Sequence, residues 1–431
     1  MPREEWFSSV CGAPIVPNTA VSKDVGIYHQ ILTPSYSVKA TFKKSHTSRH
    51  GLAINDGHIF AAQDGKSQVH VYSRLRGNQE ALVSFTERIS SLALSGNVLI
   101  LGTIEGRLIL WETCTGRQVT TPPCHLQAIS CIAVTPHHIL SASQDSNINV
   151  WSLARLLEFD SQPDLAPEST LSNHRGAITD LLVSPGSNPE TSFCVSSSKD
   201  KTCIFWDYRT GQVLRTLLFP AMPLCLSLDP SGRALVAALE GGALFLADLF
   251  GEDPLLGAGS PESTFVVQIG APLGSADADA GDASCMAFSY DGSCVLTGHT
   301  KGKVLKWSLT ENNHPVELAN LNASVTNVVF APLVTSERHV QPHTVVKPNQ
   351  MQRNYTFTAQ LKSDAAGETR FDRMFNAQGF LTDTLEEAIV SFMTPPPVES
   401  EEDGSFDAFS SFVNDQKRLN KPFLKEHVET I

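Results

Sequence analysis

The sequence predicts an all-β fold, a seven-bladed β-propeller, followed by a short, partly helical C-terminal tail. Three observations predict it. A short apolar run that ends in Trp, or in a residue at the same place, recurs between turns. The ends of these runs are about 40 residues apart where the repeat is compact, which is close to the ~40–45 residues of a four-stranded propeller blade. Hydrophobic residues do not recur at helical spacing across this region, so helix–strand alternation is not expected.

The repeats can be followed in order along the chain. Clear copies run from Gly106 to Trp111 and from Asp200 to Trp206, each between two turns. Weaker copies carry Tyr or Ala in the place of Trp, and loops widen some spacings to about 55–60 residues. The seven marker residues predict seven blades: Tyr28, Tyr72, Trp111, Trp151, Trp206, Ala247 and Trp307.

Further apolar runs precede five of the markers, and we expect them to be the inner strands of those blades. They cover residues 89–94 and 98–102, 129–134 and 139–143, 178–183 and 193–198, 224–228 and 234–238, and 286–289 and 294–298. After Trp307, strand-like runs follow at residues 316–321, 325–331, 344–347 and 355–361. We expect residues 6–10 to complete the last blade beside these runs, because an open blade edge would expose unpaired backbone groups.

Two sets of polar residues recur at matched offsets within the repeats. The first is His125, Ser141, Asp145 and Trp151, and the second is His174, Ser196, Asp200 and Trp206. In a blade, the His of the incoming loop can bond both the Ser and the turn Asp, while the Ser also bonds the indole N–H. Such satisfied buried networks stabilise a fold by roughly 0.5–3 kcal/mol per bond. The repeat ending at Trp111 has Glu105 in the turn and no matching His, and the repeat ending at Trp307 has Lys301 in the turn, so we expect those blades to be held mainly by packing.

The same residue types could form a Ser–His–Asp nucleophile triad, and this alternative is disfavoured. The set occurs twice at the same phase of the repeat, which is typical of architecture, and neither Ser lies in a G-x-S-x-G elbow. The sequence offers no phosphate-binding Gly loop and no His/Cys metal-ligand spacing. We therefore expect no catalytic residues, no metal site and no cofactor.

Bulk composition restricts the partners. The net charge is −13, and the basic clusters are small, at Lys43, Lys44 and Arg49 and at Arg74 and Arg76. Strong autonomous nucleic-acid binding is therefore not expected.

The apolar runs are too short to span a membrane. The nine Cys show no CxxC spacing and predict buried free thiols in a reducing compartment.

Three stretches interrupt the compact repeat, and we expect surface loops there. They are residues 156–172, residues 251–263 and the Gly-, Ala- and Asp-rich residues 270–282, which are typical of a flexible low-complexity segment.

The strand pattern stops near residue 362, so we expect a propeller over residues 1–361 and an acidic tail over 362–431. Asp383 and Glu386 form a helix-start signature, and two amphipathic turns with an apolar stripe follow. Each stripe must dock on the propeller or on a partner, and the tail is our candidate partner-binding element. Its apolar residues are Leu381, Leu385, Ile389, Phe392, Phe406, Phe409 and Phe412.

Several stretches resemble the IPI-type family of fungal pre-rRNA-processing WD-repeat proteins and its animal counterparts. They are residues 51–63, 101–116, 150–159 and 198–202, and the more specific Ala247-Asp-Leu-Phe250 and Val325-Thr-Asn-Val-Val-Phe-Ala-Pro332. This resemblance covers most of the seven-bladed WD-repeat propeller and little of the tail.

The resemblance implies a non-catalytic scaffold subunit of a nuclear complex, located in nucleolus and nucleoplasm. Such a complex processes the second internal transcribed spacer of pre-60S particles, pairs the propeller with a helical-repeat scaffold subunit and docks a midasin-type AAA ATPase.

Two other functions stay open at this stage. A phosphoinositide-binding propeller would need a Phe-Arg-Arg-Gly motif, and the chain offers only Arg74-Leu75-Arg76-Gly77. A ubiquitin-ligase substrate receptor is a second alternative, although no F-box-like helical segment precedes the blades. The fold alone does not choose between these functions.

Overall fold

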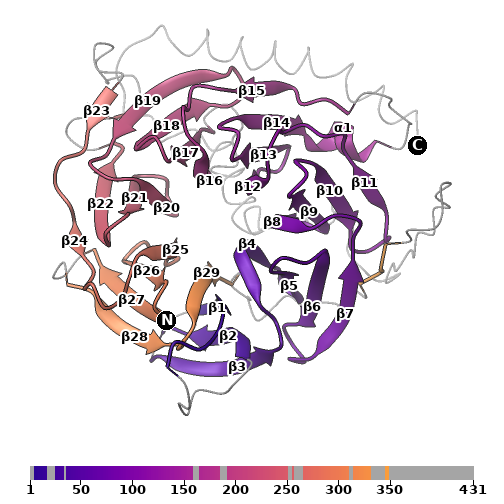
Figure 1. The fold of residues 1–431 in the computed structure, drawn as a ribbon, viewed down its shortest axis with the longest axis horizontal. Helices are drawn as coiled ribbons and strands as arrows, with labels where there is room; N and C mark the ends of the chain where they lie inside the picture. Colours follow the sequence, from indigo (N-terminus) through magenta and orange to yellow (C-terminus); the bar gives the residue numbers. More distant parts are fainter. Residues whose placement is uncertain are drawn as a thin grey trace, which may run out of the picture. The chain divides into compact units, whose positions relative to one another are not determined.

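The structure is a computed structural model that describes residues 4–16, 25–33, 35–158, 165–184, 192–250, 255–256, 266–309, 314–331 and 345–348. Within these residues, seven sheets are arranged radially, as Figure 1 shows in a view down the axis of the ring, and we call the region around this axis the central channel. The prediction of a seven-bladed β-propeller is confirmed. We number the blades 1–7 from the sheet that contains the N-terminal strand.

Each blade is given from its innermost strand outward. Blades 1 to 3 are β29 (Ser324–Phe330), β1 (Glu5–Cys11), β2 (Val25–Ile31) and β3 (Ser37–Lys43); β4 (Thr47–Ile54), β5 (His58–Gln63), β6 (Gln68–Ser73) and β7 (Gln79–Ser84); and β8 (Ile89–Ser95), β9 (Val98–Thr103), β10 (Leu108–Glu112) and β11 (Gln118–Thr120). Blade 4 is β12 (Ile129–Val134), β13 (His138–Ser143), β14 (Ile148–Ser152) and β15 (Ser169–Leu171).

Blade 5 has a fifth strand, which pairs in parallel with its fourth. Its strands are β16 (Ile178–Val183), β17 (Cys194–Ser198), β18 (Thr202–Asp207), β19 (Gln212–Leu218) and β23 (Val266–Gln268). Blades 6 and 7 are β20 (Pro223–Leu228), β21 (Ala234–Leu239), β22 (Ala243–Asp248) and β24 (Gly274–Ser275), and β25 (Ala283–Phe288), β26 (Cys294–His299), β27 (Lys303–Ser308) and β28 (Val316–Asn320). Because β23 covers the outer edge of β19, blade 5 hides backbone groups that an edge strand would expose.

All seven marker residues lie on the third strand of their blade, and all are buried. The core is not central but lies between neighbouring blades. At the seam of blades 2 and 3, Trp111 meets the edges of Phe60 and Phe85 with ring centroids 6.2 and 6.0 Å away. The Trp that ends each repeat therefore joins two successive blades, and this is why the repeat specifies a ring.

The ring closes in blade 1, where the two ends of the propeller chain meet. Strand β1 pairs with β2 on one side and with β29 on the other, so the expected pairing of residues 6–10 with residues 325–331 is present. Residues 316–321 were expected in the same blade, and this was wrong: β28 pairs with β27 of blade 7, the strand that precedes it in sequence. Residues 345–347 form no strand, and residues 355–361 lie outside the described residues.

Two predicted loops contain ordered strands instead. Within residues 156–172, β15 pairs with β14 and buries Leu171, because the blade needs an outer strand there. That stretch also overlaps the helix α1 (Leu153–Leu157), capped by the Ser152 side chain. Residues 270–282 supply β24 and bury Ala276 and Ala280 against blades 6 and 7, so they are not a flexible segment. Most of residues 251–263 lie outside the described residues.

Candidate functional site

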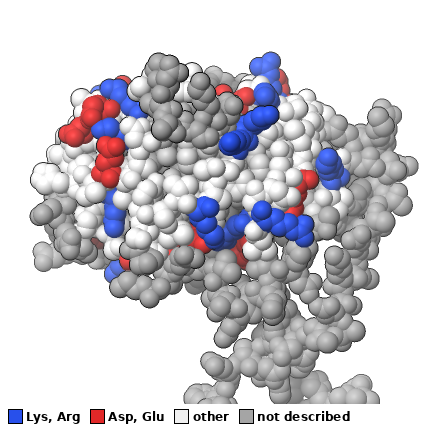
Figure 2. Space-filling model, turned by 90° about the horizontal axis from the view of Figure 1, so that it is seen from below, with Lys and Arg blue, Asp and Glu red and all other residues white. Residues whose placement is uncertain are grey.

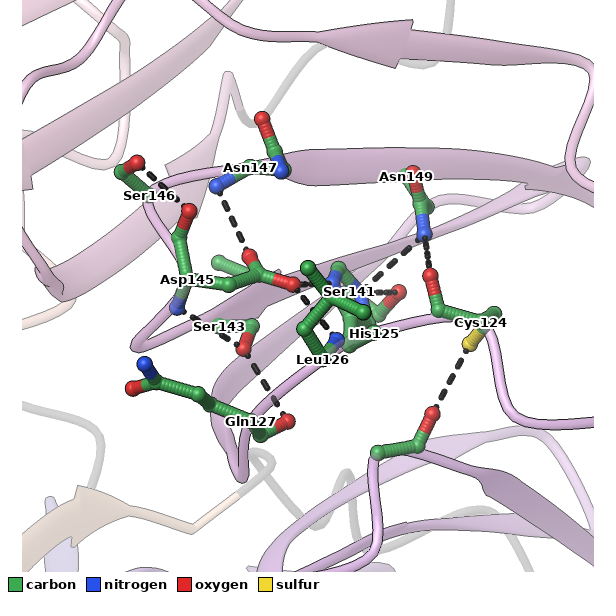
Figure 3. A network of polar contacts seen from close by, with 12 residues as sticks. Cys124, His125, Leu126, Gln127, Ser141, Ser143, Asp145, Ser146, Asn147 and Asn149 are labelled. Atoms are coloured by element: carbon green, nitrogen blue, oxygen red, sulfur yellow. Dashed lines mark hydrogen bonds and ion pairs between the residues drawn. The ribbon is translucent and has the colours of Figure 1, made fainter.

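In blade 4, the four predicted network residues lie together, and Figure 3 shows three of them, His125, Ser141 and Asp145. His125 contacts Ser141 Oγ through Nε2 at 2.9 Å and Asp145 Oδ2 through Nδ1 at 3.3 Å. The Trp151 indole N–H donates to the same Ser141 Oγ at 3.1 Å. Asp145 also accepts the backbone N–H of Leu126 and of Asn147, at 2.9 and 3.0 Å. One side chain from each of four consecutive segments is thus joined in a single network.

Blade 5 repeats the arrangement with the second set. His174 contacts Ser196 Oγ at 2.7 Å and Asp200 Oδ2 at 3.3 Å, and the Trp206 indole N–H donates to Ser196 Oγ at 2.8 Å. Burial disfavours a charged Asp200, but bonds from His174, Thr202 and the Arg175 N–H outweigh it and hold the pKa of Asp200 well below its usual range.

Each donor in these networks is used once. The indole N–H donates to the Ser oxygen, the Ser hydroxyl donates to Nε2, and the Nδ1–H donates to the carboxylate, which assigns a neutral imidazole with its proton on Nδ1. Burial lowers the pKa of His125 in spite of the opposing pull of Asp145. A neutral His at physiological pH agrees with this assignment.

The hydrogen-bond order Ser–His–Asp matches a nucleophile triad, but the surroundings do not. Ser141 and Ser196 are fully buried, and the oxygen of each already accepts an indole N–H. A substrate carbonyl would need a free path to that oxygen. These two sets therefore have the geometry of structural hydrogen-bond networks that stabilise their blades.

Both His lie in loops that lead into a blade. These loops lie on the same side of the disc as the turns between second and third strands, since successive strands run antiparallel. We call this side the histidine face. Leu126 and Arg175 directly follow the two His residues and are exposed on it.

Blade 7 has a polar network that the sequence pattern did not reveal, in addition to the packing that was expected to be its main support. The Trp307 indole N–H donates to Thr297 Oγ1 at 2.9 Å, and Thr297 contacts His299 Nε2 at 2.9 Å. His299 Nδ1 reaches the carbonyl of Gly281 at 2.9 Å. The His comes from the second strand itself, two residues after Thr297, where side chains share a face. That spacing is the signal that could have found it.

In blade 3, a segment that is distant in the sequence supplies the acceptor for the indole N–H of the Trp. The position equivalent to Ser141 is Leu101, which offers the Trp111 indole no acceptor. The indole N–H instead donates to the carbonyl of Val346 at 3.1 Å, and the N–H of Val346 donates to the Thr113 carbonyl at 2.8 Å. Residues 345–348 are thereby attached to the seam of blades 2 and 3.

The inner end of β4 carries a second missed feature. A bulge between Thr47 and Leu52 directs Arg49 and His50 into the central channel, and His50 has a φ of 54°. Arg49 Nη2 donates to the carbonyl of Leu224 in blade 6 and lies 3.7 Å from Asp180 in blade 5. His50 Nε2 lies 3.8 Å from Asp180, and burial lowers the pKa of His50 to about 4. The cluster connects three blades across the channel.

The small basic clusters do not form an extended basic surface. Arg49 points into the channel, and Arg74 is buried and lies 3.3 Å from Glu5. Figure 2 shows that Lys and Arg on the rim around β28, β3 and β7 lie in separate groups with acidic residues near several of them. Among the described residues on this side, the Lys and Arg groups give the phosphates of a nucleic acid no continuous basic track.

In the part of the chain that the structure describes, neither a metal site nor a membrane-spanning helix is present. No group of three or more His, Cys, Asp or Glu there could hold a metal ion, and no described helix is long and apolar enough to cross a bilayer. All nine Cys are free thiols, five buried and four half-buried. The predicted partner-binding residues Leu381, Leu385, Ile389, Phe392, Phe406, Phe409 and Phe412 lie outside the described residues.

Comparison with known proteins agrees with this geometry. The family model of the WD domain, G-beta repeat, matches residues 116–152 and 165–207, which include both His–Ser–Asp–Trp sets. The chain is 27% identical over 306 residues to Pre-rRNA-processing protein IPI3 of Yarrowia lipolytica, covering 67% of this chain and 69% of that protein. The chain carries WD repeats and is similar to IPI-type WD-repeat proteins.

Other relatives of this chain come from animals and plants. WD repeat-containing protein 18 of Homo sapiens is 26% identical over 308 residues, covering 68% of this chain and 67% of that protein. Protein ROOT INITIATION DEFECTIVE 3 of Arabidopsis thaliana is 27% identical over 294 residues, which is 66% of this chain and 64% of that protein. The match thus spans just under two thirds of the Arabidopsis relative.

Proposed function

We propose that this protein is a non-catalytic scaffold subunit of a nuclear complex for pre-rRNA processing and maturation of the large ribosomal subunit. The observation that carries the proposal is its match, over two thirds of the chain, to a relative named for pre-rRNA processing. In this proposal the protein works in nucleolus and nucleoplasm, binds a helical-repeat scaffold subunit and the pre-60S particle, and helps to recruit a midasin-type AAA ATPase.

The architecture supports a scaffold role. The Ser, His and Asp side chains that resemble a catalytic triad are hydrogen-bonded within their own blades, and Ser141 and Ser196 are fully buried. These hydrogen bonds stabilise a rigid disc with two broad faces that are lined by loops. A protein that holds other proteins in place requires such faces. We propose the apolar residues of the tail, from Leu381 to Phe412, as one partner-binding element.

Rapid depletion of the protein in its own cells tests the proposed function. We expect precursors that retain the second internal transcribed spacer to accumulate, and large subunits to fall while small subunits stay constant. Affinity capture of the tagged chain should recover a helical-repeat subunit and large-subunit precursors. If processing of the ribosomal RNA precursors stayed normal after depletion, the proposal would be refuted.

Point variants divide the contributions of disc and tail. Complementation with Leu385→Asp and Phe392→Asp should fail to recover the helical-repeat subunit if the tail binds it. The matched control is Leu75→Asp, an exposed leucine on a propeller turn. Equal recovery by all three variants would remove the tail from the proposal and leave the disc as the binding element.

The phosphoinositide alternative finds no support in the placement of its candidate motif. Arg74, which would have to reach a lipid headgroup, is 5% exposed in its side chain and paired with Glu5. Flotation with vesicles that contain phosphatidylinositol 3-phosphate should therefore leave the protein unbound. No contact in the described residues favours a ubiquitin-ligase receptor.

A further inference from the structure

Leu126 is the most exposed large hydrophobic residue among those that the structure describes, with 93% of its surface accessible. It lies on the histidine face in the loop that leads into blade 4. Its backbone is fixed on both sides, because its N–H donates to Asp145 Oδ2 at 2.9 Å and the carbonyl of the following Gln127 accepts the Ser143 hydroxyl at 3.1 Å. Because this backbone is already ordered, binding of a partner over Leu126 would cost little conformational entropy there.

A second exposed aliphatic residue stands on the adjoining turn of blade 3. Ile104 is 42% exposed and belongs to the same turn as Gly106, whose carbonyl accepts the N–H of His125. The N–H of Ile104 donates to the Arg88 carbonyl at 3.1 Å, which places the exposed Arg88 beside it. The seam of blades 3 and 4 thus presents two aliphatic side chains with a cation at its edge.

Blade 5 continues this surface with positive charge. Arg175 occupies the position equivalent to Leu126, and its N–H is held by Asp200 Oδ2 at 2.9 Å. Lys199 and Lys201 flank Asp200 on the same turn, and both are exposed. Asp200 is ionised between them, so this surface carries three cations against one carboxylate.

The neighbouring part of the histidine face has the opposite sign. Glu240 and Asp277 are exposed on the loops of blade 6, where Asp279 pairs with Lys303 at 2.6 Å. An anionic partner is therefore attracted to blades 3–5 and repelled from blade 6, on a chain whose net charge of −13 otherwise repels anions.

We propose that the histidine face over blades 3–5 docks an acidic segment of a partner protein that inserts an aliphatic or aromatic side chain between Leu126 and Ile104. Arg88, Arg175, Lys199 and Lys201 receive its carboxylates. A fixed apolar centre inside a charged rim is the usual anatomy of a protein-binding hot spot. This surface follows from the loops of the disc and does not depend on the pathway proposed above.

A protein segment fits this surface better than RNA does. The six side chains named in the proposal include no aromatic ring on which a base could stack, and the centre of the patch is aliphatic.

The test pans a phage library of random 12-residue peptides against the full-length chain, followed by fluorescence polarisation of the enriched peptides. We expect enrichment of peptides in which Asp or Glu surrounds a Leu, Ile, Phe or Trp. Leu126→Glu should weaken their binding by about tenfold or more, and Lys199→Glu with Lys201→Glu should do so most at low salt.

Matched controls lie elsewhere on the disc. Leu75→Glu and Arg209→Glu change an exposed leucine and an exposed arginine on turns of the opposite face, and both should leave peptide binding unchanged. Equal loss in these controls, or no acidic enrichment at all, would overturn the proposal. So would tighter binding of a fluorescent 20-nucleotide polyuridine RNA that the Leu126 and Lys199/Lys201 variants abolish, since the surface would then be an RNA site. Circular dichroism verifies that each variant is folded.

Discussion

Blades 4 and 5 differ from blade 3 in how they satisfy the same buried indole. In blades 4 and 5, a Ser of the same blade accepts the Trp N–H, and His and Asp complete the network. In blade 3, Leu101 replaces that Ser, and the acceptor is the carbonyl of Val346. A buried indole donor requires a partner, but the fold does not dictate where in the chain the partner comes from. Blades 4 and 5 are thus self-contained, and blade 3 depends on residues downstream of the propeller strands.

The largest effect is expected from removing the shared acceptor in blade 5. Ser196→Ala leaves the indole of Trp206 and Nε2 of His174 without their partner, which should cost about 2–4 kcal/mol in the free energy of unfolding. Urea unfolding measures this cost. Adding Trp206→Phe removes one orphaned donor, so the double variant should lose less than the sum of the two single variants. If the costs of the two single variants were strictly additive, Ser196 and Trp206 would have no interaction energy.

The turn carboxylates give the next largest contrast. Asp200→Asn weakens the bonds to His174 and the Arg175 N–H and should cost about 1–2 kcal/mol. Glu105, in the corresponding turn of blade 3, is exposed and has no His to bond, so Glu105→Gln should stay within about 0.5 kcal/mol. Thermal unfolding of the two variants side by side checks the difference, and equal destabilisation would show that the carboxylate acts through something other than the network.

The attachment of residues 345–348 is a smaller target. Val346→Pro removes the N–H that donates to Thr113 and should cost about 1 kcal/mol. The sharper measurement is hydrogen exchange of the indole protons by NMR. Exchange at Trp111 should accelerate, while Trp151 and Trp206 keep their protection because their acceptors belong to their own blades. Lys347→Ala, at an exposed neighbour, is the control and should change neither.

The smallest expected effect is a difference in pH response. The pKa of His125 is lowered in the folded protein, so unfolding takes up protons below the ordinary His pKa of about 6.5. The contribution of His125 is therefore complete above that pH and is lost as the pH falls below it. Amide exchange in blade 4, corrected for its intrinsic pH dependence, should lose protection between pH 7 and pH 5 more than exchange in blade 3, which has no such His. Loss of protection in blade 3 first would reverse the comparison.

The sequence predicts the fold well because the propeller repeats its signals. The Trp markers, the turns before them and the alternation of apolar residues each recur several times, so a weak copy such as Ala247 is identified by its neighbours. Both His–Ser–Asp–Trp sets lie together in the structure because their offsets encode fixed positions within a blade.

The missed features are those that no local pattern encodes. Arg49 and Asp180 meet across the channel from blades 2 and 5, and their contact depends on closure of the whole ring. The docking of Val346 on Trp111 joins residues separated by 235 positions, and its signal is the absence of a hydroxyl at Leu101. Polar residues at inward positions of apolar strands, such as Asp180 in β16, are the clue that sequence reading could have used.

The pairing of β1 with β29 has a consequence for biosynthesis. Ser9 and Thr326, which touch across this pair, are 317 residues apart, so a nascent chain releases β1 from the ribosome long before its inner neighbour exists. Until translation reaches β29, the half-made disc carries an unsatisfied strand edge that other chains can template on. A chaperone that shields β1 during synthesis would act where this molecule is most vulnerable, and any premature stop before residue 324 leaves a disc that cannot shut.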